Sequence, residues 1–352
     1  MLVAVLLFPV KTNAVSARSF CVLDAVSGRI LDEKEPDRRS LIASTTKIMT
    51  ALLVAERCNV LDRMRVPKEA VGIEGSSMYL REGEVLTLQE LLYGLMLSSG
   101  NDAAVALAIY CGGTVQGFVE LMNDKARLLG LTGTHFENPN GLDSPEHYST
   151  ARDLAVLAAY AMENPIFAKT VSTRTVCAGN RYLRNHNKLL WLVEGADGVK
   201  TGFTKAAGRI LVSSASRQNR RLIVVTLNDP NDWQDHTALL NSGFSRYTLT
   251  KLLSAGDQVG DLEIVGGTVS PVPVIAAEDF SYALAPEEKV TTMLSLRSPI
   301  FAPVAEGEDA GAVYVLLNGK AVGKVPVTYG RTSEQKPEKP KKLFWMFWNR
   351  DA

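Results

Sequence analysis

Three short strings in this sequence combine side chains that can form and break a covalent bond to a substrate. In chain order they are Ser44-Thr45-Thr46-Lys47, Ser99-Gly100-Asn101 and Lys200-Thr201-Gly202. A serine hydroxyl becomes a nucleophile only beside a base, and a lysine can be that base only if burial or a nearby cation lowers its pKa. Each string alone is equally well explained as a helix cap, a loop or a strand end. Together they indicate a serine nucleophile activated by lysine.

The spacing of Ser44 and Lys47 suits this chemistry if the two residues begin a helix. The stretch from Thr46 to Arg57 contains neither Gly nor Pro and is rich in apolar residues, which predicts a helix. Residues three apart share a helix face, and a helix N-terminus offers unpaired N–H groups and a positive dipole end. Lys200 would be the cation that lowers the pKa of Lys47. The second and third strings fall at boundaries between predicted elements, where side chains can converge on a cleft.

The elements around these strings predict one domain of mixed structure. Residues 20–23 and 29–31 flank a Ser-Gly turn and indicate a β-hairpin, while residues 210–214 and 221–227 are rich in Val and Ile, as strands are. Between them, apolar residues recur at three- and four-residue steps, which predicts helices over 86–97, 103–110, 115–128 and 151–162. We therefore expect an α/β (α+β) domain whose sheet joins segments distant in sequence and which carries a helical insertion.

The chain is long enough for two domains and changes character near Gly256. Single cores stop growing at roughly 250–300 residues, and this chain has 352. After Gly256, short β-branched runs alternate with Gly and Pro, which predicts a small all-β module. The expected division is a signal peptide at 1–17, a catalytic domain at 18–254, an all-β domain at 255–330, and a linker with an amphipathic anchor at 331–352.

Both ends of the chain indicate export and attachment to a membrane surface. Leu2 to Val10 form an apolar core, and Val15-Ser16-Ala17 offers small residues for signal peptidase, although a buried N-terminal strand is the alternative. At the other end, Lys341-Lys342 precede six apolar residues, too few to cross a bilayer but suited to its interface. A disordered tail or a strand docked on the body is the alternative there. We expect an exported protein at the extracytoplasmic face of the membrane or in the cell wall.

Charge and the placement of cysteine and histidine argue against other kinds of site. Lys plus Arg equals Asp plus Glu at 38 each, so no nucleic-acid partner is expected. The cysteines and histidines show no metal-ligand spacing, and no G-x-S-x-G serine accompanies a histidine, so we predict neither a metal site nor a histidine triad. Cys58 and Cys111 lie in apolar helical patterns and are interpreted as core thiols, although disulfides remain permitted in an exported protein.

The three strings in this order match the signature of penicillin-binding proteins and class A β-lactamases. The longer strings around them resemble the D-alanyl-D-alanine carboxypeptidase family, the low-molecular-weight penicillin-binding proteins. Gly100 separates the second motif from that of class A β-lactamases, which carry Asp there. The resemblance covers nearly the whole chain and implies a transpeptidase-like domain with an antiparallel sheet, followed by the all-β domain. It rests on Ile42–Ala51, Ser98–Ala104, Gly198–Thr204, Gly75–Met78, Asn140–Asp143 and Tyr148–Asp153.

The resemblance implies a catalytic role for four side chains and two backbone groups. Ser44 would attack the carbonyl between the two terminal D-alanines of a peptidoglycan stem peptide, and Lys47 would take its proton. Ser99 would relay a proton to the leaving amine, while Asn101 would orient Lys47 and the substrate amide. The backbone N–H groups of Ser44 and Phe203 would form the oxyanion hole. Water would then hydrolyse the acyl-enzyme, and β-lactams would acylate the same serine.

The third motif would bind substrate. The resemblance implies that Lys200, Thr201 and Gly202 line the subsite of the terminal carboxylate, with Lys200 and Thr201 binding it, and that no metal or organic cofactor is required. One departure bears on this subsite. Some relatives carry an arginine after the next strand that assists carboxylate binding, but residues 228–235 contain none. Carboxylate recognition is therefore expected to rest on Lys200 and Thr201 alone.

Two other functions are compatible with these motifs. A serine β-lactamase shares the nucleophile, but class A enzymes deacylate through a glutamate-activated water, and the sequence has no E-x-x-L-N segment. A catalytically weak penicillin-binding or sensing wall protein would have a degenerate site, whereas all three motifs are intact. The carboxypeptidase is therefore the favoured prediction.

Overall fold

The computed structural model describes residues 15–337, which fold as two compact units with their boundary between Tyr247 and Thr248. This boundary comes earlier than the predicted one after residue 254. The reason is that β10 (Thr248–Leu253) pairs with β14 (Phe280–Leu284) and so belongs to the second unit. The apolar core of the predicted signal peptide and the anchor at 341–348 lie outside the described residues.

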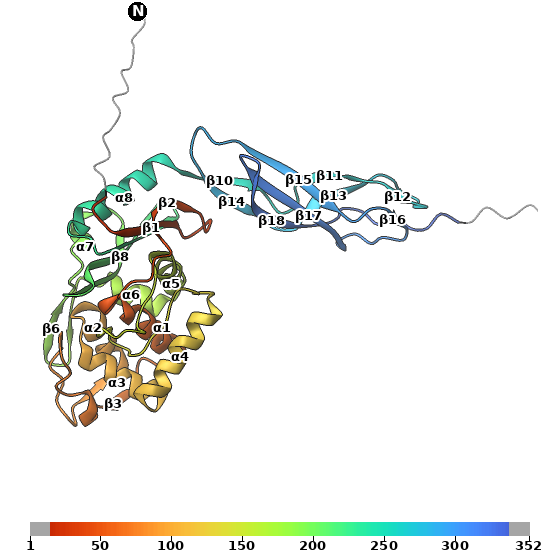
Figure 1. Ribbon diagram of the computed structural model, residues 1–352. Helices are drawn as coiled ribbons and strands as arrows, with labels where there is room; N and C mark the ends of the chain where they lie inside the picture. Colours follow the sequence, from red (N-terminus) through yellow and green to blue (C-terminus); the bar gives the residue numbers. More distant parts are fainter. Residues whose placement is uncertain (1–14, 338–352) are drawn as a thin grey trace, which may run out of the picture. The chain divides into compact units, whose positions relative to one another are not determined.

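The first unit is built on one antiparallel sheet, as predicted, and its strands come from both ends of the unit. The strand order is β2-β1-β9-β8-β7, and the early hairpin pairs with late strands because β1 joins β9 along its whole length. Figure 1 shows the helices on both faces of this sheet, with α8 on one side and α5 on the other. The strands are β1 (Ser19–Asp24), β2 (Ile30–Lys34), β7 (Ala196–Thr204), β8 (Gly208–Arg217) and β9 (Arg220–Leu227).

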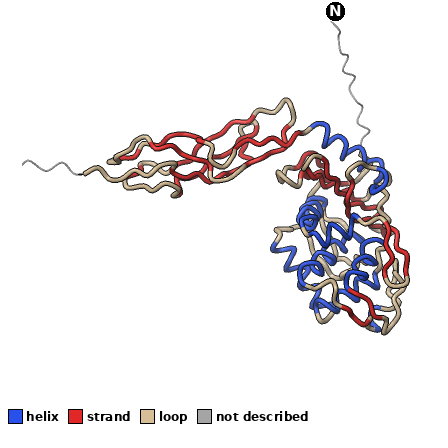
Figure 2. The backbone as a smooth tube through the Cα atoms, turned by 180° about the vertical axis from the view of Figure 1, so that it is seen from behind, coloured by secondary structure: helices blue, strands red, loops and turns tan. Residues whose placement is uncertain are grey.

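The predicted helical insertion is present between β2 and β7. All five helices expected from the sequence occur, and helices the sequence reading did not propose include α6 and α8. The helices are α1 (Lys47–Arg57), α2 (Leu88–Leu97), α3 (Asn101–Gly112), α4 (Val115–Leu128), α5 (Ala151–Glu163), α6 (Pro165–Ser172), α7 (Leu189–Leu192) and α8 (Asp232–Arg246). The insertion also contains two pairs of short antiparallel strands. In the first pair β3 (Arg63–Arg65) is bonded to β4 (Val85–Thr87), and in the second β5 (Thr175–Ala178) is bonded to β6 (Arg181–Arg184). Figure 2 shows the helices gathered largely below the sheet.

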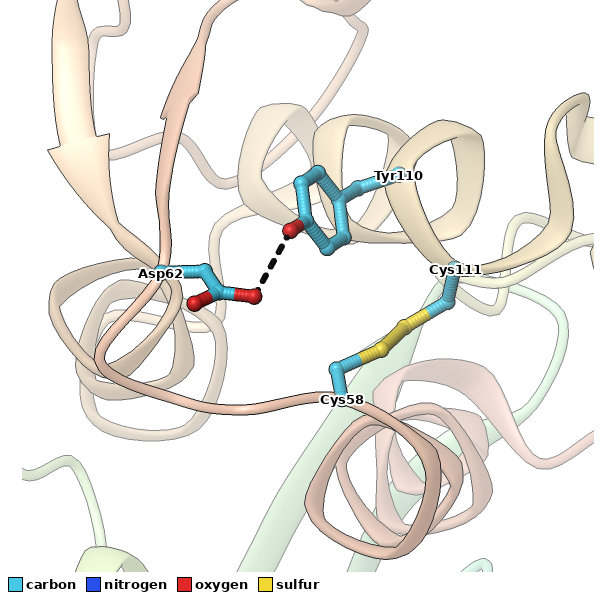
Figure 3. The surroundings of a disulfide bond; sticks show 4 residues. All are labelled: Cys58, Asp62, Tyr110 and Cys111. Carbon is cyan, nitrogen blue, oxygen red and sulfur yellow. Dashed lines mark hydrogen bonds between the residues drawn. A yellow bond between two sulfur atoms is a disulfide. The ribbon is translucent and has the colours of Figure 1, made fainter.

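Cys58 and Cys111 form a disulfide, so their interpretation as core thiols is wrong. Cys58 caps the C-terminus of α1 and Cys111 lies in the last turn of α3, and the two helix ends meet with a Cα–Cα separation of 6.7 Å. That separation falls in the range that disulfides span. Figure 3 shows the bond beside Tyr110, whose hydroxyl donates to Asp62 at 3.1 Å.

Two residues of the predicted signal peptide are packed on the first unit. The backbone N–H of Ser16 donates to Asp235 at 2.7 Å, and its Oγ lies 2.6 Å from a carboxylate oxygen of Asp229. Ala17 is fully buried, and its carbonyl accepts a hydrogen bond from Lys34 at 2.8 Å. The folded body therefore begins earlier than the predicted boundary after residue 17.

The second unit is all-β, as predicted. Its main sheet has the order β11-β13-β18-β17-β15 around a valine-rich core, and β12 pairs with β16. Its strands are β11 (Gln258–Leu262), β12 (Ile264–Val265), β13 (Val272–Ala276), β15 (Val290–Leu296), β16 (Ile300–Phe301), β17 (Asp309–Leu317) and β18 (Lys320–Tyr329). The unit extends past residue 330, because Ser333 is buried and donates to Val269 at 2.7 Å, and Lys336 donates to Gly266 at 2.8 Å. The start of the predicted linker thus belongs to this unit.

Among the described residues, no single helix is both long and apolar enough to span a bilayer. Within residues 15–337, one pair of helices, α3 and α4, passes that test of length and composition together, and it is bent by 83° at the break.

Candidate active site

Ser44 lies in the turn that leads into α1. Residues Ala43–Thr46 form a 3₁₀ turn, η1, and α1 continues from Lys47. Ala43 has φ of +45°, a left-handed conformation that L-residues other than glycine rarely adopt. Ser44 is half-buried, whereas Thr45, Thr46 and Lys47 are buried. The turn therefore presents the hydroxyl of Ser44 while its neighbours point into the core.

Lys47 holds its amine against the hydroxyl of Ser44. Its Nζ lies 3.0 Å from Ser44 Oγ and 2.6 Å from both Asn101 Oδ1 and the carbonyl oxygen of Asn140. The side chain is fully buried. Burial, followed by the positive charge of Lys200, holds the pKa of Lys47 well below its usual value. The site thus meets the requirement for a lysine base that the sequence set.

The position of Asn101 fixes which end of its amide faces Lys47. Its Nδ2 donates to the carbonyl of Glu74 at 2.5 Å, so Oδ1 is left for the lysine, and its backbone N–H donates to Ser76 at 2.7 Å. The following residue, Asp102, holds the same loop. Its carboxylate accepts hydrogen bonds from Ser77 Oγ and from the backbone N–H groups of Met78, Leu80 and Ala103.

Ser99 lies in the same cleft as Ser44. It is 5 % exposed and has φ of +60°, again in the left-handed region. Strained backbone of this kind persists where the surrounding structure enforces it, and it clusters at functional sites. Ser99 precedes α3, and it lines the cleft together with Ser44 and Thr201.

A loop from residue 138 to 143 completes the surroundings of Ser44 and Lys47. Besides the contact of Asn140 with Lys47, the carbonyl of Pro139 accepts a hydrogen bond from Thr50 at 2.6 Å. Gly141 has φ of +90°, and a Cβ there would lie 1.9 Å from the carbonyl oxygen of Ala43. Only glycine can therefore bring this loop against the turn that carries Ser44.

We expect Gly141→Ala to lower the free energy of unfolding by about 2–4 kcal/mol and to slow acylation, because the loop must move away from Ala43. Gly113→Ala is the matched control, since Gly113 also has a positive φ, +73°, but a Cβ there meets no atom within 4 Å. It should cost about 1 kcal/mol. Urea denaturation and stopped-flow labelling measure both effects. Equal losses in the two variants would contradict the close contact at Gly141.

His147 supports the turn from behind. Its Nδ1 accepts from the backbone N–H of Glu137 at 3.0 Å, so Nε2 carries the proton and donates to Thr46 Oγ1 at 2.7 Å. Thr46 in turn donates to the carbonyl of Ala43 at 2.9 Å. Burial lowers the pKa of His147 to about 4, so the ring is neutral. It is a positioning residue, which acts on the turn through Thr46.

The third motif lies on β7, beside the turn η1 that carries Ser44. A Cβ on Gly202 would lie 3.3 Å from the backbone nitrogen of Ser44, so the strand and the turn are in close contact. Lys200 is 1 % exposed, and its Nζ donates to the carbonyl of Thr201 at 2.9 Å. Burial lowers the pKa of Lys200 to about 7. Phe203, which follows, is 64 % exposed.

The three motifs meet in one cleft of about 310 Å³. It is lined by Ser44, Ser76, Ser99, His186, Thr201, Gly202, Phe203, Arg209, Ile210, Asp232 and Trp233. Lys47 and Asn101 lie behind Ser44, and Lys200 lies beneath Thr201. The structure thus brings together all the site residues that were predicted from the three motifs.

Sequence reasoning missed several residues of this site. Asn140 acts through a backbone carbonyl, which has no residue-specific signal, although its string was noticed. Asp102 could have been found from its position, because it directly follows Asn101 of the second motif. Arg209 was overlooked because it lies just before the predicted strand 210–214, and Asp232 because residues 228–235 were searched for an arginine.

Comparison with known proteins gives consistent matches along the chain. A family model described as D-alanyl-D-alanine carboxypeptidase matches residues 8–231, and one described as Penicillin-binding protein 5, C-terminal domain, matches 247–335. D-alanyl-D-alanine carboxypeptidase DacF of Bacillus subtilis is 31 % identical over 88 % of this chain and 84 % of its own length. DacC of Escherichia coli is 32 % identical over 90 % and 84 %. The crystal structure of penicillin binding protein 5 from Haemophilus influenzae has a TM-score of 0.82 at 30 % identity, covering 93 % of this chain and 100 % of that one.

Proposed function

The chain belongs to the D-alanyl-D-alanine carboxypeptidase family of serine hydrolases, and from this premise we propose how the residues of its site divide the reaction. Ser44 Oγ attacks the carbonyl between two terminal D-alanines, its proton passes to Lys47, and an ester to the enzyme replaces the peptide bond. The proton then goes through Ser99 to the amine of the departing D-alanine. Water hydrolyses the ester, which restores the hydroxyl of Ser44 and leaves the peptide one residue shorter.

The hydrogen bonds of Lys47 are the observation that carries this proposal. A neutral amine has two N–H donors and one lone pair. Asn101 Oδ1 and the carbonyl oxygen of Asn140, each 2.6 Å from Nζ, can accept only, so they take the two donors. The lone pair is then left for the hydroxyl of Ser44 at 3.0 Å. Burial and the charge of Lys200 disfavour the charged form of the amine, and in its neutral form these contacts aim the lone pair at Ser44.

The oxyanion of the tetrahedral intermediate falls between the turn and β7. We assign its two donors to the backbone N–H groups of Ser44 and Phe203, because the contact at Gly202 brings β7 against the backbone nitrogen of Ser44. Lys200 and Thr201 lie at the same strand and take part in holding the carboxylate end of the substrate. β-Lactams, which carry a strained amide and a carboxylate, acylate Ser44 in the same way.

The ratio of turnover on peptide to turnover on penicillin tests the assigned reaction. An Nα-acylated peptide that ends in D-Ala-D-Ala should release D-alanine in many cycles. Penicillin should acylate Ser44 once, and the resulting ester should be hydrolysed slowly. This follows because the sequence lacks the glutamate segment that activates the deacylating water in class A β-lactamases. Faster turnover of penicillin than of peptide would favour the β-lactamase instead. Acylation without turnover of either would favour a penicillin-sensing protein.

We propose that the protein acts outside the cytoplasm and is held at the membrane by its C-terminal tail. The apolar N-terminal segment supports export, and Lys341-Lys342 with the six apolar residues after them support an interfacial anchor. Each inserted apolar side chain contributes at most about 1.5–3 kcal/mol, and each lysine about 1 kcal/mol on anionic lipid.

Ending the chain at Pro337 should release the protein from anionic vesicles without changing peptide cleavage in solution, because both described units stay complete. Sedimentation with vesicles at low and high salt measures binding, and the full chain should bind less at high salt. Binding that persists in the shortened protein would place the anchor elsewhere. Loss of cleavage would show that the tail packs on the body.

A further inference from the structure

The substrate of a carboxypeptidase ends in a carboxylate, so its cleft must offer a cation. Two of the side chains that line the cleft, other than Arg209, can be ionised: His186 and Asp232. Burial and the charge of Lys200 lower the pKa of His186, so it is neutral near pH 7. Asp232 repels a carboxylate. Neither can therefore supply the cation.

Lys200 alone meets this need poorly. Its side chain is 1 % exposed, and its Nζ already donates to the carbonyl of Thr201. Its pKa of about 7 leaves a large share of the molecules uncharged at neutral pH. Lys200 also lies close enough to Lys47 to lower the pKa of that residue, so its charge already acts on the base.

Arg209 is placed and held as a carboxylate ligand. It lies on β8 directly opposite Phe203 of β7, next to the third motif, and its side chain is 44 % exposed in the cleft. Its Nη2 donates to both oxygens of Asp232 at 2.8 Å, and the guanidinium lies 5.8 Å from the ring of Trp233. These contacts fix the group while Nη1 and Nε make no hydrogen bond among residues 15–337. The planar guanidinium can offer parallel N–H groups to both oxygens of a carboxylate.

We propose that Arg209 binds the terminal carboxylate of the substrate and sets the preference of the cleft for peptides that end in a free acid. Asp232 holds Arg209 through Nη2 alone, so the other N–H groups of the guanidinium are left for the substrate. The cation thus comes from the strand after the third motif and does not require an arginine among residues 228–235. The inference rests on the peptide cleavage assigned above and deepens it.

Kinetics on a matched pair of peptides test this role. The substrates are one Nα-acylated peptide ending in D-Ala-D-Ala as the free acid and the same peptide as the C-terminal amide. In Arg209→Gln, KM for the acid should rise about 10- to 100-fold with little change in kcat, while the constants for the amide stay within about twofold. Arg209→Lys keeps the charge without the fork and should recover part of the preference. Arg217→Gln is the control, because Arg217 lies on the same strand and contacts Glu194 and Asn241 outside the cleft.

The possible outcomes separate this inference from the proposed function. If the native protein cleaves neither peptide, the proposed function fails. If it cleaves the acid but Arg209→Gln changes acid and amide equally, Arg209 only anchors α8 to the sheet and the inference fails. Should Arg209→Gln not fold, arginine modification of the native protein by phenylglyoxal decides. D-Alanine, the product that carries the terminal carboxylate, should protect Arg209 from the reagent, and protection by D-alaninamide to the same degree would overturn the inference.

Discussion

A Ser44→Ala variant should lose peptide cleavage and covalent penicillin labelling together, by about 10,000-fold or more in each rate. One hydroxyl serves both reactions, and among the described residues Ser44 has the one hydroxyl that is hydrogen-bonded to Lys47. The fold should survive, because Ser44 is only half-buried and Lys47 keeps its bonds to Asn101 and Asn140. D-Alanine release and labelling by a fluorescent penicillin measure the two losses.

Ser242→Ala is the control for this variant, since Ser242 is an exposed residue of α8. It should react like the native protein. Labelling that persists in Ser44→Ala and maps to another serine would show that the nucleophile is assigned wrongly.

A Lys47→Met variant should acylate about 100- to 10,000-fold more slowly than the native protein, which is the usual contribution of a general base. Methionine fits the buried channel of the lysine but cannot accept a proton. The native rate should also fall as the pH drops through the lowered pKa of Lys47, because protonation occupies the lone pair that faces Ser44. The variant should lack this pH dependence.

Stopped-flow acylation by a chromogenic β-lactam over a series of pH values measures both effects. Lys169→Met, which changes an exposed residue of α6, should leave the rate and its pH dependence unchanged. A Lys47→Met rate within about tenfold of the native rate, with the same decline at low pH, would transfer the role of base to another group.

The chemistry of the site could be predicted because it is carried by side chains at short, fixed spacings. The three-residue step from Ser44 to Lys47 places the base beside the nucleophile in any helical turn. The intact second and third motifs then indicated which distant residues converge on them. The sheet followed from strand patterns at both ends of the first unit, and the second unit from its alternating apolar runs.

The remaining features depend on contacts that sequence patterns do not record. The acceptor from Asn140 is a backbone carbonyl, which every residue possesses. The pairing of Cys58 with Cys111 depends on how α1 and α3 end relative to each other, and helical periodicity says nothing of that. Arg209 reaches the cleft only because β8 pairs with β7 in the register that sets it opposite Phe203, and a one-residue slip would turn it away.

The lowered pKa values of the two buried lysines also arise from the fold. Lys47 and Lys200 lie on elements far apart in the sequence, and burial in the same core removes both from water. Burial lowers the pKa of both lysines, and the positive charge of Lys200 lowers the pKa of Lys47 further. The sequence predicts that Lys200 lowers the pKa of Lys47. The structural basis of this effect is the packing of β7 against the turn η1.

Mass spectrometry of a stem pentapeptide incubated with the purified protein tests the central claim most directly. The peptide should lose the mass of one alanine residue, and brief acid quenching should trap the shortened peptide as an ester on the proteolytic fragment that contains Ser44. An intact pentapeptide in the presence of folded protein, or an adduct confined to a fragment without Ser44, would contradict a carboxypeptidase that works through this serine.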